Sequence, residues 1–210
     1  MTTGIILLMI IGLLVYLGAA HRVLDRLYLT DKSALLIIAL MIIGSFFDLT
    51  IKRNPLLTIN IGGGLIPLLL SVYVFIKADS RKERIRTLVA VFLTGLAIYA
   101  ISIIFSDFGH GRDIIDPMYL YAISGGLIAY LLGRSRRASF IAGTIGFLLY
   151  NLFIYYRLLT GEIRSQLRIG GAGVYDSIII SGVLAVLLAE FLGESLERLT
   201  GGHSGKGGEE

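Results

Sequence analysis

Cysteine and tryptophan are absent from this chain of 210 residues, and charged residues are scarce. Without cysteine there can be no disulfide framework, no thiolate metal site and no cysteine nucleophile. Charged residues make up 16% of the chain, whereas a soluble domain carries about a quarter because its surface must be hydrated. Because 55% of the residues are hydrophobic, the composition excludes a soluble globular domain and a disordered chain, and it indicates a membrane protein.

Seven apolar segments are each long enough to cross a bilayer as a helix, which takes about 20 residues. They predict an all-α fold, a polytopic transmembrane helical bundle of seven spans that forms a single domain over residues 1–195. The polar, glycine-rich tail over residues 196–210 is expected to be disordered. The predicted spans cover residues 4–20, 34–51, 56–76, 87–106, 117–133, 138–156 and 173–193.

The basic residues between the spans predict the orientation of the bundle. Of the 19 Lys and Arg, 13 fall in alternate segments on one side and 6 on the other. The positive-inside rule places the richer side in the cytoplasm, so the N-terminus lies outside and the C-terminus is cytoplasmic. Because basic residues mark loops in a membrane protein, the net charge of +4 gives no reason to expect a nucleic-acid partner. The expected partner is the lipid bilayer of the cell membrane.

The third span has an unusual backbone sequence, because Asn60, Gly62, Gly63, Gly64 and Pro67 lie within eight residues. Each glycine weakens a helix by about 1 kcal/mol relative to alanine, and the proline removes a backbone donor. We therefore expect the outer half of this span to be kinked or broken. Broken helices line cavities in transporters and channels. A proline kink that serves only packing is the alternative.

An internal repeat links this span to the fifth one. Residues 54–70 and 116–132 align without a gap, and 8 of 17 positions are identical. The shared positions include a proline and two adjacent glycines. Glycine pairs let helix backbones approach closely, so the repeat is either a shared packing device or part of a functional site.

Acidic residues gather on the predicted outer side. Asp116 precedes the fifth span, and Asp176 and Ser177 open the seventh, where a carboxylate is favoured as a helix cap. Asp48 is expected at the C-terminal end of the second span, where the helix dipole disfavours it. Ionisable residues inside membrane spans usually serve a function, so Asp48 is the strongest candidate.

The segments 44–48, 59–67 and 169–178 resemble a prokaryotic family of multi-pass membrane proteins, which is known as a domain of unknown function (number 1614). The resemblance extends over residues 30–195. It implies a seven-span membrane protein with polar motifs in spans two, three and seven, and it implies no activity.

A second motif, Gly171 to Asp176, is similar to the Gly-x-Gly-Asp segment of presenilin-like intramembrane aspartyl proteases, although two extra residues precede the aspartate. The chemistry of those enzymes needs two carboxylates that share a proton and activate a water. The similarity implies Asp176 as one catalytic acid, with Asp48 or Asp116 as the other.

Three hypotheses follow. The first is an outward-facing polar pocket that binds or transports an ion or a small polar solute. The second is the intramembrane protease, and the third is a membrane scaffold without a site. No motif for a cofactor or a metal ion is recognisable, so neither is predicted, and catalysis and homo-oligomerisation stay open. The residues predicted to line the polar pocket are Asp48, Asn60, Gly62, Gly63, Gly64, Asp176 and Ser177.

Overall fold

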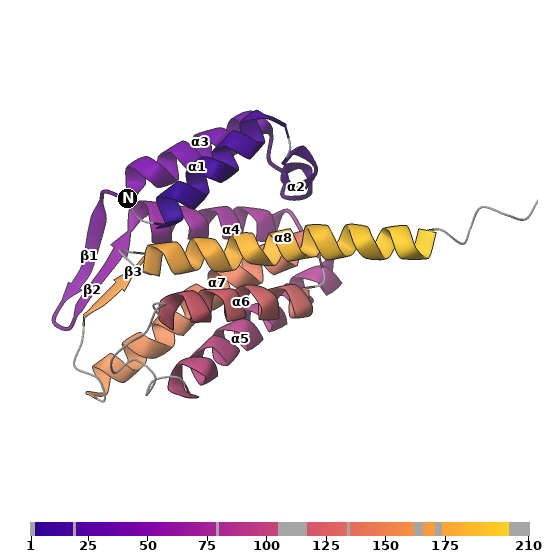
Figure 1. The fold of residues 1–210 in the computed structure, drawn as a ribbon. Helices are drawn as coiled ribbons and strands as arrows, with labels where there is room; N and C mark the ends of the chain where they lie inside the picture. Colours follow the sequence, from indigo (N-terminus) through magenta and orange to yellow (C-terminus); the bar gives the residue numbers. More distant parts are fainter. Residues whose placement is uncertain are drawn as a thin grey trace, which may run out of the picture.

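The chain is mostly helical in the computed structural model (Figure 1). The structure describes residues 3–18, 20–78, 80–104, 117–133, 135–161, 166–170 and 174–201. Its α-helices are α1 (Thr3–Tyr16), α2 (His21–Arg26), α3 (Asp31–Gly44), α4 (Ile66–Ile76), α5 (Arg81–Ile104), α6 (Pro117–Gly133), α7 (Arg136–Leu159) and α8 (Val174–Gly201). Each of the seven predicted spans therefore overlaps one of these helices, and α2 is an additional short one.

The helix α7 is the central element of the bundle and packs against α4, α5, α6 and α8. Glycine allows the helices to approach closely. A Cβ atom on Gly95 of α5 would come within 2.9 Å of the Gly146 carbonyl oxygen in α7. A Cβ atom on Gly143 of α7 would come within 2.8 Å of the Ser181 carbonyl oxygen in α8. Such small-residue contacts are a common way to pack helices inside a membrane.

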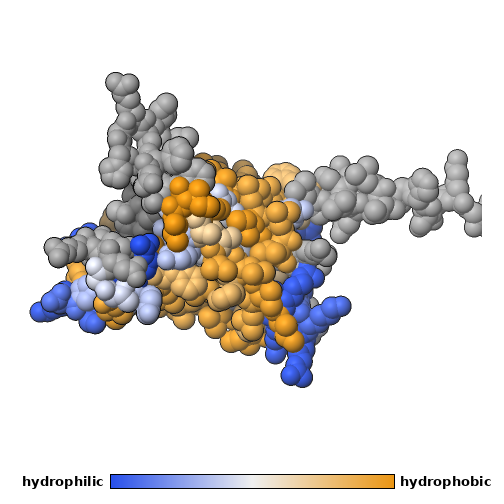
Figure 2. Space-filling model, turned by 90° about the horizontal axis from the view of Figure 1, so that it is seen from below, coloured by the Kyte–Doolittle hydropathy of each residue, from blue (hydrophilic) through white to orange (hydrophobic). Residues whose placement is uncertain are grey.

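The outer surface of the helices is apolar. The helices α5 and α7 are long enough and apolar enough to cross a membrane. The helices α1 and α3 have 14 residues each and are about 21 Å long, which is less than the ~30 Å of a bilayer core. Figure 2 shows an apolar surface with hydrophilic side chains toward two opposite ends. The exposed apolar side chains include Leu13, Leu36, Leu88, Phe92, Leu131 and Leu152.

A small sheet at one end of the bundle corrects the all-α prediction. Its strands are β1 (Asp48–Arg53), β2 (Leu56–Asn60) and β3 (Leu167–Ile169), in the order β1-β2-β3. The strand β1 is antiparallel to β2, and β2 is parallel to β3. The segments that form β1 and β2 each contain a Thr-Ile pair, and these β-branched residues favour extended backbone. Pairing also satisfies backbone groups that would otherwise face an apolar environment.

The second predicted span is shorter than expected. The helix α3 ends at Gly44 rather than at residue 51, so Asp48 begins a strand and does not sit at a helix C-terminus. The reason for placing Asp48 among functional residues was the unfavourable helix dipole at that position. That reason no longer applies.

The predicted break in the third span is confirmed. The segment begins as β2, continues through a π-helical turn at Ile61–Leu65, here called η1, and becomes α-helical only at Ile66. The proline Pro67 lies in the first turn of α4, where its missing N–H group needs no partner within the helix.

The two ends of the bundle collect different segments, and we name them the sheet end and the α2 end. At the α2 end, Arg86 of α5 donates a hydrogen bond of 3.0 Å to the Gly133 carbonyl oxygen of α6. The guanidinium of Arg137 lies 3.5 Å from the carboxylate of Glu83. These segments are the ones that the positive-inside rule assigns to the cytoplasm. The helix α8 continues to Gly201, beyond the predicted start of the tail, and the rest of the tail lies outside the described residues.

Candidate functional site

The side chain of Asn60 connects three segments at the sheet end. Its amide nitrogen Nδ2 donates to the carbonyl oxygen of Ser45 (2.8 Å) and of Phe47 (3.2 Å), and to Oδ1 of Asp48 (2.8 Å). Its own oxygen Oδ1 accepts from the backbone N–H of Gly63 (2.9 Å). The structure therefore brings the side chains of Asp48 and Asn60 and the backbone of Gly63 together.

These contacts give Asn60 a structural role. The first N–H groups of a helical segment have no partner within it, and Asn60 satisfies one of them as the N-cap of η1. Its amide hydrogens bind carbonyl oxygens that follow α3, so the side chain holds the end of α3 against the start of η1. Asn60 is buried, with 3% of its surface exposed, whereas Asp48 is exposed on the edge strand β1.

Several glycines at the sheet end lie where the backbones of two segments are in contact. A Cβ atom on Gly62 would lie 2.0 Å from the Met41 carbonyl oxygen of α3. Beyond β3, Gly170 has a φ of +68°, and a Cβ there would lie 2.4 Å from the carbonyl carbon of Gly63. Both positions require glycine, the second also because its backbone is left-handed. We call Gly44, Gly62, Gly63, Gly64 and Gly170 the glycine joint.

The internal repeat serves packing in both of its copies. In the first copy, a Cβ on Gly64 would meet the Ile59 side chain at 2.8 Å. In the second, a Cβ on Gly126 of α6 would meet Leu184 and Ser181 of α8 at 3.0 Å. These contacts favour the packing interpretation of the repeat over the functional one.

The remaining predicted site residues belong to the start of α8 and to the segment before α6. Ser177 is fully buried in α8. Asp176 lies in the first turn of the same helix, but its side chain is outside the described part of the structure, and so is the whole of Asp116. The distance between the carboxylates of the hypothetical protease pair therefore stays undetermined.

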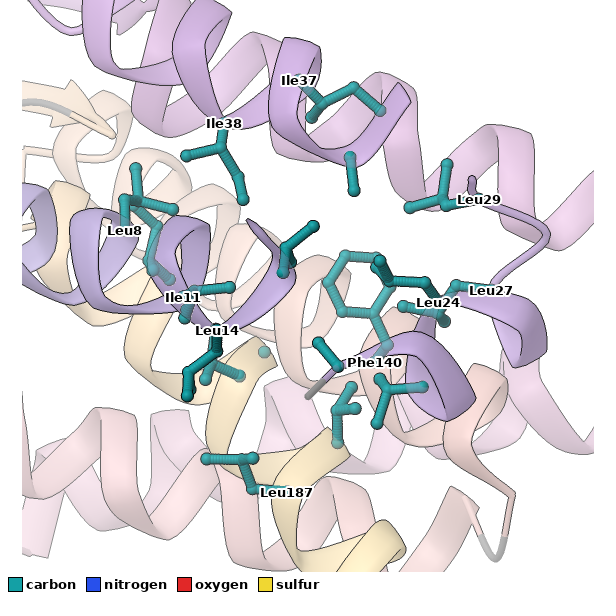
Figure 3. A pocket seen from close by; sticks show the side chains of 18 of the residues that line it. Leu8, Ile11, Leu14, Leu24, Leu27, Leu29, Ile37, Ile38, Phe140 and Leu187 are labelled. Atoms are coloured by element: carbon teal, nitrogen blue, oxygen red, sulfur yellow. The ribbon is translucent and has the colours of Figure 1, made fainter. Parts of the chain in front are cut away.

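A cavity of about 780 Å³ lies elsewhere, between the helices α1, α2 and α3 on one side and α4, α7 and α8 on the other (Figure 3). Its walls are almost entirely hydrocarbon. Neither Asp48 nor Asn60 lines it. The side chains around it include Leu8, Ile11 and Leu14 of α1, Ile38 of α3, Phe140 of α7 and Leu187 of α8.

The shape of the cavity follows from how α1 and α3 are attached. Near the sheet end, Leu8, Met41 and Ile179 form a tight apolar cluster beside the glycine joint. From there, the α1–α3 pair diverges from α8 toward the α2 end (Figure 1). The short helix α2 covers the widening gap, with Leu24 and Leu27 buried against it. The cavity is thus narrow near the glycine joint and widens toward the α2 end.

Ionisable side chains reach the cavity at its α2 end. Glu190 of α8 lines it, and Oε2 of this carboxylate forms an ion pair with Nε of Arg136 in α7. Both side chains are largely buried, at 15% and 18% exposed. A buried pair of this kind avoids the cost of an isolated charge in an apolar environment.

The imidazole of His21 lies at the rim of the cavity. Its Nδ1 donates to the Asp31 carboxylate at 3.2 Å, and its Nε2 lies 3.8 Å from Asp25. The hydrogen bond to Asp31, and secondarily the charge of Asp25, raise the pKa of His21 above its ordinary value of 6.5. His21 therefore connects α2 to the start of α3 most strongly when it is protonated.

The segment after α2 is anchored to the bundle by Tyr28. Its φ of +58° is unusual for a residue that is not glycine. The guanidinium of Arg137 lies 4.9 Å from the centre of the Tyr28 ring, and Tyr73 of α4 donates to the Tyr28 carbonyl oxygen at 3.2 Å. These contacts hold the wall formed by α2 in place.

Sequence reasoning did not identify this cavity, because its walls are leucine, isoleucine and valine residues that look like any other part of an apolar span. One signal was available. Glu190 is an ionisable residue near the end of the seventh span, and such residues mark functional sites by default.

A family model described as "Protein of unknown function (DUF1614)" matches residues 37–188 of the chain, well over half of its length. No curated protein and no solved structure matches the chain. The matched region includes the glycine joint and fewer than half of the residues that line the cavity, and α1, α2 and Glu190 lie outside it.

Proposed function

We propose that this chain, which belongs to the family of proteins of unknown function DUF1614, is a multi-pass protein of the cell membrane that binds a lipophilic molecule in the cavity beside α1. The observation that carries the proposal is the cavity itself. It has a volume of about 780 Å³ and walls of hydrocarbon side chains. Small-molecule sites typically enclose ~300–1,000 Å³ behind mostly apolar walls with a few polar groups.

The grouping of the loops supports a multi-pass arrangement. The predicted cytoplasmic segments meet at the α2 end, and the two ends are separated by exposed apolar side chains (Figure 2). Water in contact with those side chains would cost about 25 cal/mol per Å² of apolar surface. A bilayer removes that cost. The lipid bilayer, which is the partner expected from the sequence, then contacts this apolar surface.

The chemistry of the cavity favours a hydrocarbon occupant over water or a polar solute. Ordered water needs two to four polar partners, and among the described lining residues only Thr144, His21 and Glu190 have polar side chains. An empty cavity would forfeit dispersion contacts along its walls. A hydrocarbon chain restores these contacts without leaving any hydrogen-bonding group unsatisfied.

A tryptophan reporter tests this proposal, since the chain has no tryptophan of its own. Leu14 lines the cavity, whereas its neighbour Leu13 does not and is 57% exposed. In Leu14→Trp, we expect a brominated single-chain lipid to quench the fluorescence saturably, at about one equivalent per protein. In Leu13→Trp, quenching should rise in proportion to the lipid content of the micelle or nanodisc. Identical, unsaturable curves for both variants would refute the proposal.

The polar-pocket, protease and scaffold hypotheses stay predictions. The polar pocket requires Asp48 and Asn60 to meet, and they do. Its test is a shift in thermal stability with a cation or polar metabolite that is lost in Asp48→Asn. The protease requires Asp176 to act with Asp48 or Asp116, so cleavage of a membrane-embedded peptide should be abolished in Asp176→Asn. A scaffold would respond to neither test.

A further inference from the structure

The cavity is elongated along the helices. It follows α1 from Leu7 to Val15 and α8 from Ile178 to Phe191, stretches of about 12 and 20 Å at the helical rise per residue. Half of a bilayer core measures about 15 Å. The cavity therefore has the length of one leaflet, which suits one extended hydrocarbon chain.

The two ends of the cavity differ in polarity. Near the glycine joint, its lining is apolar and includes Leu7, Leu8 and Met41. At the α2 end, the lining includes Glu190 and His21. A molecule that is apolar over most of its length and polar at one tip would match both ends, with its tip at the α2 end.

The polar end offers an acceptor. Arg136 pairs with Oε2 of Glu190, and among the described residues no hydrogen bond reaches Oε1 of this carboxylate. The ring nitrogens of His21 face the carboxylates of Asp31 and Asp25. Among the described residues that line the cavity, Glu190 is the one with a carboxylate, so a donor at the tip of the ligand would find an acceptor there and a carboxylate would meet a like charge.

We infer that the occupant is a single-chain amphiphile whose head group, an ammonium or a hydroxyl, donates a hydrogen bond to Glu190 while its chain lies between α1 and α8. This inference rests on the proposed function and specifies its ligand class. An ammonium gains both a charge-assisted hydrogen bond and an opposite charge at Glu190. A hydroxyl gains only the hydrogen bond, and a carboxylate faces repulsion.

A head-group series on the purified wild-type protein tests the inference. We would measure binding of a primary alkylammonium, an alkanol and an alkanoate of equal chain length by their displacement of bound brominated lipid, which native mass spectrometry follows. The ammonium should bind about tenfold or more tightly than the alkanoate, because a hydrogen bond to a charged group contributes about 1.5–3 kcal/mol. The alkanol should lie between them.

Two variants test whether Glu190 is the residue that determines the head-group preference. In Glu190→Gln, Arg136 loses its charge partner, so the order should invert in favour of the alkanoate. Glu83→Gln is the matched control, because it removes the carboxylate beside Arg137 at the same end of the bundle but does not line the cavity. It should keep the wild-type order. If Glu190→Gln fails to fold, the wild-type series alone decides.

The possible failures are distinguishable. Equal binding of all three head groups would overturn the inference and leave the lipophile site standing. Preference for the alkanoate in the wild type would overturn it as well. Absence of binding for every chain would overturn the proposed function.

Discussion

The α1–α3 pair is attached to the rest of the molecule in two different ways at its two ends. At the sheet end, the backbones of Gly44 and Gly62 are in contact, and Asn60 hydrogen-bonds across them. At the α2 end, aliphatic side chains and Phe140 face one another across open volume. The first attachment is filled by backbone contacts, and the second leaves an open volume.

The comparison shows that unusual residues do not by themselves mark a binding site. The run from Asn60 to Gly64 has the composition of a broken transporter helix, yet its amide and its glycines are used to bring two backbones together. Ordinary leucines and isoleucines enclose the volume. The close contact is also what creates the cavity, because helices held together at one end and splayed at the other leave a wedge between them.

The largest effect on stability should come from a side chain that prevents the backbone contact at the glycine joint. In Gly62→Ala, the new methyl group would lie 2.0 Å from the backbone oxygen of Met41, which cannot move like a flexible side chain. We expect a loss of about 3 kcal/mol or more in the free energy of unfolding. Gly12→Ala is the control, because its methyl group would meet only Ile38 at 3.6 Å. It should be neutral or slightly stabilising. Equal thermal stability of the two variants would contradict the close backbone contact at Gly62.

An intermediate effect is expected from Asn60→Asp. This change keeps the shape but removes the donors that bind the carbonyl oxygens of Ser45 and Phe47, and it adds a charge beside Asp48. Stability should fall by about 2–3 kcal/mol. Asp48→Asn, at an exposed position, should change it by less than about 0.5 kcal/mol. Chemical denaturation of both variants measures the contrast. A larger loss in Asp48→Asn would favour the polar-pocket hypothesis.

The smallest effect is a change in the pH dependence of stability, which comes from His21 at the α2 end. The pKa of His21 is raised in the folded chain, so its contact with Asp31 stabilises fully below about pH 6.5 and is lost as the pH rises through the raised value. The wild type should therefore lose slightly more stability than His21→Gln between about pH 6 and pH 9. Thermal unfolding over that range tests it. Parallel pH profiles would show that the imidazole does not hold α2.

Much of the helical architecture could be predicted from the sequence. The long apolar runs located α7 to within 3 residues at each end and α6 at the predicted residues 117–133, whereas α5 begins 6 residues before its predicted span and α8 ends 8 residues after it. Asn60, the glycine run and Pro67 predicted the broken third span. These successes have one cause, since helix-breaking residues and apolar runs act locally.

The sheet and the cavity could not be predicted in this way. The strands β1 and β2 read as the ends of apolar spans, and only pairing with β3, more than 100 residues later in the sequence, reveals their state. The cavity depends on the angle between the α1–α3 pair and α8. No local pattern encodes that angle, because it depends on contacts between segments far apart in the sequence, such as those among Leu8, Met41 and Ile179.

The most direct measurement of the lipophile site is native mass spectrometry of the protein extracted gently from membranes. We expect the wild type to retain one lipid-sized molecule. In the double variant Ile11→Trp/Ile38→Trp, two indole rings would enter the cavity from α1 and α3, and the retained molecule should be lost. The control Leu13→Trp/Leu36→Trp adds the same mass on the exposed faces of α1 and α3 and should retain it. Retention in both variants, or in neither the wild type nor the control, would contradict the proposal that this cavity binds a lipophilic molecule.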